Sequence, residues 1–115
     1  MANTFKLITK AGVTSADVIY TVAGSTTTVI LGLMIGNTTS SSVNATLTIE
    51  SDTSNRSGNN DETNQNVELL KTTAIPGTST LELLGGNKVV METTDVLKVT
   101  GSGAVDVTLS VMEIT

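Results

Sequence analysis

The sequence predicts an all-β domain, an antiparallel β-sandwich of the jelly-roll kind with about nine strands. Thr and Val are abundant, and their β-branched side chains fit a pleated sheet better than a helix. No stretch repeats apolar residues at helical spacing over several turns, whereas short apolar runs are separated by Gly, Pro, Asn and Asp. A chain of 115 residues is normally one domain. We therefore expect a single β-sandwich domain over residues 1–115, with a polar loop insertion at residues 51–66.

The first two expected strands are Thr4 to Lys10 and Asp17 to Val22, separated by a glycine-containing turn. In the first strand, Phe5 and Leu7 share one face, while Ile8 shares the other face with the two lysines. The second strand places its apolar side chains on a common face in the same way. Both segments are therefore expected to pair within the sandwich.

The third expected strand runs from Thr27 to Asn37 and is apolar on both faces. Strict alternation places Val29, Leu31, Leu33 and Ile35 on one face, and Ile30, Gly32, Met34 and Gly36 on the other. A small sandwich has one core, so the second face is predicted to contact a partner chain, and the glycines would let that chain approach closely. The alternative is a strand interrupted by a bulge.

Two further strands alternate without interruption, Val43 to Ser51 and Ala104 to Ile114. This pattern places Leu47 and Leu109 in the core and Thr108 on the outward face. Between them, the stretch from Ile75 to Val99 contains three short apolar runs. The runs are separated by the corners Pro76-Gly77, Gly85-Gly86-Asn87 and Thr93-Thr94-Asp95. Consecutive runs with turns between them predict a β-meander, with which the rest of the chain pairs.

The sequence offers little for catalysis. It contains neither His nor Cys, so the common nucleophile–base pairs and zinc sites cannot be assembled. Gly85-Gly86-Asn87-Lys88 joins two strands and precedes no helix, so it is interpreted as a hairpin turn and not a phosphate loop. Tyr20 could stack on a sugar ring but is expected to pack in the core with its hydroxyl at the edge. We expect no enzyme activity and no cofactor.

The polar insertion carries the carboxylates Asp52, Asp61 and Glu62 but no apolar side chain. Nothing there would hold two carboxyl groups at a fixed separation for sugar cleavage. The segment from Asp52 to Gly58 departs from a calcium loop, since Arg56 stands where an oxygen ligand belongs. We therefore expect no metal site in this loop.

Net charge and hydropathy argue against nucleic acid and membrane as partners. The formal net charge of −5 argues against nucleic acid, which selects basic surfaces. The longest apolar run, Val29 to Ile35, is too short for a helix to cross a bilayer, so no membrane partner is expected. Met1 to Thr4 lacks the features of an export signal.

Several segments resemble small virion structural proteins of tailed bacteriophages, with those of marine and cyanobacterial phages as the nearest group. These segments are Thr21 to Leu33, Ala74 to Gly77, Leu84 to Val90 and Val105 to Thr115. The likeness covers most of the chain apart from the insertion, and it lies in β-patterns and not in a chemical signature. One departure is Thr94-Asp95, where Gly-Asp would be expected.

The resemblance implies a virion protein assembled in the host cytoplasm. Capsid decoration (a cement protein) is the favoured role, as a homotrimer that contacts the major capsid protein or another virion protein. Ile30, Gly32, Met34 and Gly36 would lie at the subunit contact. A tail or neck component, or a receptor- or glycan-binding module of the particle, are the alternatives.

Overall fold

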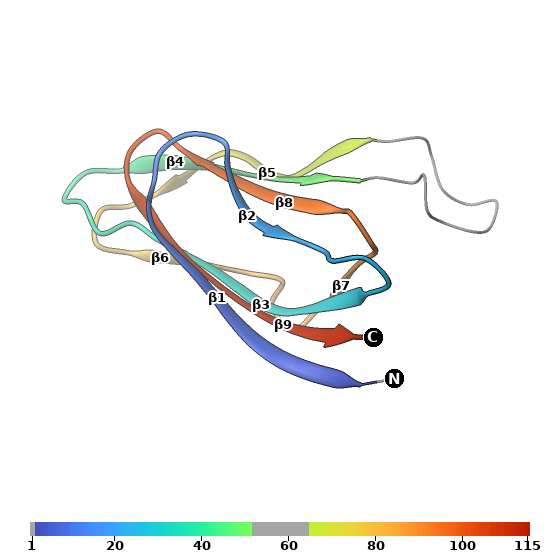
Figure 1. Cartoon of the computed structure of the whole chain (residues 1–115). Helices are drawn as coiled ribbons and strands as arrows, with labels where there is room; N and C mark the ends of the chain where they lie inside the picture. Colours follow the sequence, from blue (N-terminus) through green and yellow to red (C-terminus); the bar gives the residue numbers. More distant parts are fainter. Residues whose placement is uncertain (1, 52–64) are drawn as a thin grey trace.

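The chain folds into a sandwich of two antiparallel sheets (Figure 1). This computed structural model describes residues 2–51 and 65–115, which form nine strands and no helix. The strands are β1 (Asn3–Val13), β2 (Asp17–Thr21), β3 (Thr27–Gly36), β4 (Val43–Glu50), β5 (Asn66–Ile75), β6 (Thr80–Leu83), β7 (Val89–Met91), β8 (Val96–Gly101) and β9 (Val105–Ile114). The predicted all-β sandwich is confirmed.

The strand order is that of a jelly roll. One sheet, sheet A, has the order β1-β9-β3-β6, with β7 also paired to β3; the other, sheet B, has the order β2-β8-β4-β5. One long hairpin contains four sets of antiparallel pairs: β1 with β9, β2 with β8, β3 with both β6 and β7, and β4 with β5. Rolling this hairpin adds the pairs β3–β9 and β4–β8, and the two chain ends lie side by side in sheet A (Figure 1).

The predicted β-meander over Ile75 to Val99 is wrong. Its first two runs, β6 and β7, both pair with β3, and its third run, β8, lies in the other sheet between β2 and β4. The corner between β6 and β7 has three successive left-handed residues, with φ of 78° at Leu84, 47° at Gly85 and 93° at Gly86. A turn signal marks where the chain changes direction, but the pairing partner of each run depends on the whole roll.

The core lies between the two inner faces, and the strictly alternating strands supply much of it. Leu47 in β4 and Leu109 in β9 are both fully buried, as their alternation predicted. Leu97 in β8 and Met91 in β7 are also fully buried. Because successive side chains of a strand point to opposite sides of its sheet, each strand presents one face to the core and the other outward.

A bulge in β3 changes the predicted faces of that strand. Relative to β9, the register shifts between Ile30 and Gly32, so that one extra residue is accommodated. Ile30 therefore points into the core, with 1% of its surface exposed, together with Leu33 and Ile35 beyond the bulge. The prediction that Ile30 shares an outward face with Met34 is wrong, since one added residue reverses the alternation.

Candidate interaction surface

The outer face of sheet A carries a continuous row of apolar side chains. In the strand register, Phe5 of β1 lies opposite Met112 of β9, Met112 opposite Val29 of β3, and Val29 opposite Val90 of β7. These four residues thus form one row across four strands, which we call the outer apolar row. It lies on the opposite side of sheet A from the buried side chains of β9.

Large apolar side chains on the outer face of sheet A are exposed to solvent. Phe5 is 72% exposed and Val90 60% at the two ends of the row, and Leu7 (68%) and Met34 (43%) lie on the same face. Between these side chains the register places Gly32 opposite Ser110. Small residues keep this part of the sheet flat, so a second protein surface can approach the backbone closely.

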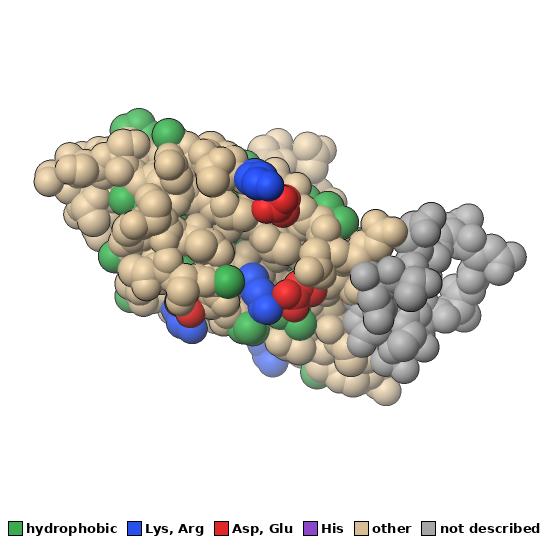
Figure 2. Space-filling view, turned by 90° about the horizontal axis from the view of Figure 1, so that it is seen from above, with side chains coloured by type: hydrophobic (Ala, Val, Ile, Leu, Met, Phe, Trp, Pro, Cys, Tyr) green, Lys and Arg blue, Asp and Glu red, His purple; other side chains and the backbone are tan. Residues whose placement is uncertain are grey.

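The outer face of sheet B differs in character. There Lys98 of β8 and Glu50 of β4 form an ion pair of 2.8 Å. Seen from this side, acidic and basic side chains lie beside one another, and hydrophobic side chains form only small separate patches (Figure 2). The contrast singles out sheet A as the face with apolar surface available for a contact.

Of the four residues predicted for an interface, three lie on the outer face of sheet A. Gly32, Met34 and Gly36 follow the bulge and point outward, whereas Ile30 lies in the core. The sequence analysis did not assign Phe5 to this surface. Alternation of apolar residues with lysines in β1 favours burial of the apolar side, and the structure has the opposite arrangement.

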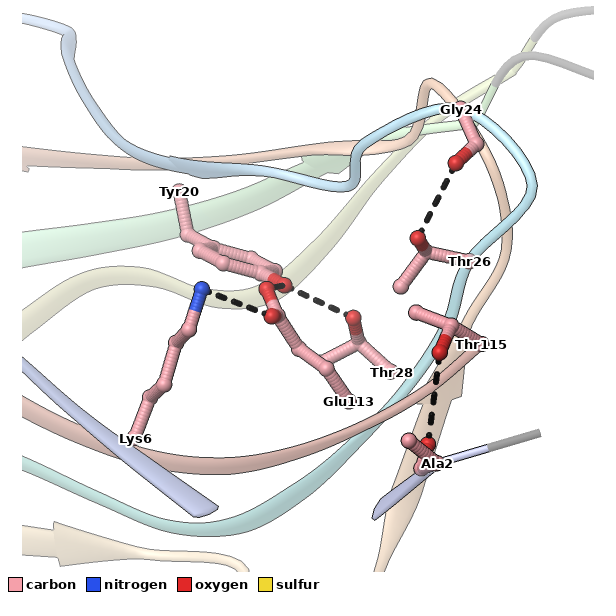
Figure 3. Close-up of polar contacts among 8 residues, drawn as sticks. All are labelled: Ala2, Lys6, Tyr20, Gly24, Thr26, Thr28, Glu113 and Thr115. Carbon is pink, nitrogen blue, oxygen red and sulfur yellow. Dashed lines mark hydrogen bonds and ion pairs between the residues drawn. The ribbon is translucent and has the colours of Figure 1, made fainter. Parts of the chain in front are cut away.

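The face of β1 that carries the lysines points inward, because Lys6 contacts a polar cluster there (Figure 3). Lys6 Nζ lies 2.8 Å from Glu113 Oε1 at the end of β9. The Tyr20 hydroxyl of β2 donates to Glu113 Oε2, at 2.5 Å. Since its single proton is used there, the Tyr20 oxygen accepts from Thr28 Oγ1 of β3, at 2.7 Å. The cluster thus joins strands of both sheets.

The electrostatics of this cluster indicate a structural role. The Lys6 ammonium and then the Tyr20 hydroxyl, both bonded to the carboxylate, lower the pKa of Glu113 below its ordinary value. Burial, followed by the bond to Glu113, raises the pKa of Tyr20 to about 12. Both shifts move away from neutral pH, whereas an acid–base catalyst works best with a pKa near the operating pH. The cluster therefore links Tyr20 of sheet B to Thr28 and Glu113 of sheet A.

A second feature is a polar hollow at one end of the sandwich, with a volume of about 460 Å³. It is lined by Gly24, Ser25, Thr93 and Thr94. Ser25 and Thr94 have left-handed backbones, with φ of 54° and 70°. Thr94 is the residue that stands where Gly would be expected, and a β-branched residue is strained there. The Ser25 hydroxyl could hydrogen-bond a polar ligand, whereas the hydroxyl groups of Thr93 and Thr94 already donate to the backbone oxygens of Thr26 and Thr93. No aromatic side chain lines the hollow among the described residues.

Among residues 2–51 and 65–115, no group of three or more acidic side chains is placed to hold a metal ion. The loop carboxylates Asp52, Asp61 and Glu62 lie outside the described residues. In the same part of the chain, no helix is long and apolar enough to span a bilayer.

Comparisons of this chain with protein-family models, with curated proteins and with solved structures found no match.

Proposed function

We propose that this protein is a bacteriophage virion structural protein, and that it serves as a capsid decoration (cement) protein that docks on the head shell and stabilises it. The observation that carries the proposal is the apolar outer face of sheet A. The resemblance of several segments to small virion proteins of tailed phages supports the same role.

The outer apolar row supplies apolar surface that assembly would bury. Burying a large apolar side chain contributes about 1.5–3 kcal/mol, before the costs of association are subtracted. Phe5 and Val90 stand at the two ends of the row and are each more than half exposed, so a partner that covers the row gains from both. Exposed apolar surface of this kind is typical of a protein contact.

We propose that this face forms the contact between copies in a homotrimer, and that the trimer holds neighbouring capsid proteins. The flat region around Gly32, with Met34 beside it, suits close approach of a second chain. A closed ring buries the same surface in every copy and leaves no unpaired interface. The proposed contact includes Gly32, Met34 and Gly36 but not Ile30, which is buried within its own core.

Sedimentation tests the contact, with a matched pair of variants. Val90→Asp places a charge on the outer face of sheet A and should convert a trimer into folded monomers. Val18→Asp introduces the same change on the outer face of sheet B, where the side chain is 47% exposed, and should leave a trimer. A wild-type monomer at tens of micromolar, or a Val90→Asp trimer, would contradict the proposed contact.

The role in the particle is tested by copy number. Quantitative mass spectrometry of purified virions should find the protein in numbers comparable to the major capsid protein. A few copies per particle would instead indicate a tail or neck component.

The polar hollow favours a second candidate, a glycan-binding module of the particle. The Ser25 hydroxyl, which lines the hollow, could bond a sugar hydroxyl. A glycan array probed with the isolated protein tests this function, with Ser25→Ala as the variant that should lose binding. Binding that survives this variant, or no binding to any glycan, would exclude the hollow as a receptor site.

A further inference from the structure

The four sheet edges of the described chain differ in how well they are protected. In sheet A the edge opposite β1 consists of β6 and β7, which have only four and three residues. In sheet B, β2 has five residues and a register shift between Val18 and Tyr20. The other edge, β5, has two register shifts against β4 and a left-handed residue at Thr72, with φ of 44°. Short and bulged edges resist pairing with other chains.

The edge strand β1 is neither short nor bulged over most of its length. Its residues from Asn3 to Lys10 pair with consecutive residues of β9, and the first register shift comes between Lys10 and Val13. Figure 1 shows β1 at the outside of sheet A, with β9 on one side only. A regular edge of this length is able to accept an added strand.

The hydrogen bonds at the chain ends show which residues point toward this free edge. Ala2 and Thr115 exchange both backbone bonds, at 3.2 and 3.0 Å. Bonded and non-bonded pairs alternate along an antiparallel ladder, so Thr4 and every second residue after it bond to β9. The N–H and C=O groups of Phe5, Leu7 and Thr9 therefore point away from β9. None of them has a strand partner among the described residues.

We propose that the free edge of β1 binds an extended segment of another protein, in which apolar and acidic residues alternate, as an additional strand of sheet A. The backbone groups of Phe5, Leu7 and Thr9 would supply the ladder bonds. Apolar residues of the segment would lie beside Phe5 and Leu7 on the outer face.

The charges of β1 select an acidic partner. The strand contains Lys6 and Lys10 and no acidic residue, in a chain with a net charge of −5. Lys6 is paired with Glu113, whereas Lys10 forms no ion pair with a described residue. Both lysines are on the inner side of β1, opposite inward residues of β9. An acidic residue of the added strand opposite Lys10 would compensate this charge.

The same lysines disfavour a second copy of β1 as the occupant. Two-fold pairing of β1 with itself brings the lysines of both copies into one two-stranded ribbon. In the register that sets Phe5 beside Leu7 of the second copy, Lys6 lies directly opposite Lys6, and like charges in opposite positions destabilise a pair. Lysines on an edge strand are a common defence against self-pairing.

The probe is a synthetic peptide of about ten residues, long enough to cover β1, in which valine and glutamate alternate. A matched peptide has lysine in place of glutamate. With the full-length protein, the glutamate peptide should slow amide exchange of Phe5, Leu7 and Thr9, and the lysine peptide should bind about tenfold or more weakly. Equal binding of the two peptides, or slowed exchange at another edge, would overturn the proposal.

Two variants locate the contact. Thr9→Pro removes one N–H at the free edge without removing a bond to β9, and Thr9→Ala changes the same side chain but keeps the N–H. The proline variant should lose peptide binding at least about tenfold and the alanine variant should keep it. Unchanged binding by Thr9→Pro would refute pairing at this edge.

If the Thr9→Pro variant fails to fold, reversing the charge at Lys10 still tests which peptide is preferred. Lys10→Glu should reverse the preference, so that the lysine peptide binds better than the glutamate peptide; an unchanged preference would refute the role of Lys10. In the Val90→Asp variant, which is expected to form no trimer, concentration-dependent slowing of exchange in β1 without peptide would identify a second copy as the occupant and overturn the proposal. The contact shares Phe5 with the proposed trimer face, but copy number and sedimentation test the trimer and the virion role without the peptide.

Discussion

The bulge in β3 places Ile30 in the core and Met34 outside, and a pair of alanine variants can test this assignment. Ile30 and Met34 lie four residues apart on the same strand, and 1% and 43% of their surfaces are exposed. Ile30→Ala removes a fully buried side chain and should lower the free energy of unfolding by about 2–5 kcal/mol. Met34→Ala, measured on the monomer, should lower it by less than about 1 kcal/mol. Ile30→Asp should abolish folding, because it buries an unpaired carboxylate.

Urea unfolding followed by circular dichroism measures both variants. With a urea dependence of about 1–3 kcal/mol per molar, the loss of about 2–5 kcal/mol at Ile30 should lower the midpoint by about 0.7–5 M. The measurements belong at protein concentrations low enough for monomers, because a subunit contact over Met34 would add to its effect. Similar losses for the two variants, or a folded Ile30→Asp protein, would show that the strand alternates without a bulge and that Ile30 faces outward.

The remaining predictions concern the core, the polar cluster and one corner. Leu109→Ala should destabilise by about 2–5 kcal/mol and its neighbour Thr108→Ala by less than about 0.5 kcal/mol, and equal losses in thermal unfolding would contradict the assigned faces. Tyr20, the single tyrosine, should titrate by tyrosinate absorbance at about pH 12, and Glu113→Gln should lower this midpoint. Because the raised pKa favours the protonated folded state, its stabilisation is present below about pH 10 and is lost as the pH rises toward 12; a midpoint near 10 in the folded protein would refute the burial of the hydroxyl. Gly77→Ala should destabilise the corner after β5, since the added carbon would lie 2.5 Å from a backbone oxygen; unchanged stability would show that this corner can shift.

The fold class could be predicted because it depends on local properties that the whole chain shares. In β4 and β9 every second residue is apolar, and a two-layer sandwich places that side inward whatever the order of the strands. Leu47 and Leu109 were assigned correctly for this reason. The jelly-roll topology and the number of strands also agree with the sequence analysis, since turn residues mark each change of direction.

Strand pairing was predictable only in part. The corners at Pro76-Gly77 and Gly85-Gly86-Asn87 lie where the sequence predicts them, but the runs that they separate pair with β3 and not with one another. A run of four residues can pair with any strand of suitable polarity. Which strand it meets depends on how the long hairpin rolls, and distant parts of the chain decide this.

The candidate surface depended on the tertiary structure still more. Alternation alone placed Ile30 outward, but the bulge against β9 turns it into the core and leaves Gly32 and Met34 outward. Phe5 is outward because Lys6 pairs on the inner side with Glu113, which also accepts a hydrogen bond from Tyr20. The sequence by itself determined the fold class, the approximate positions of the strands and the turns between them. Which face is buried, and which edge is left open, was decided by contacts between segments far apart in the chain, because burial depends on what lies opposite a residue and not on its neighbours in sequence.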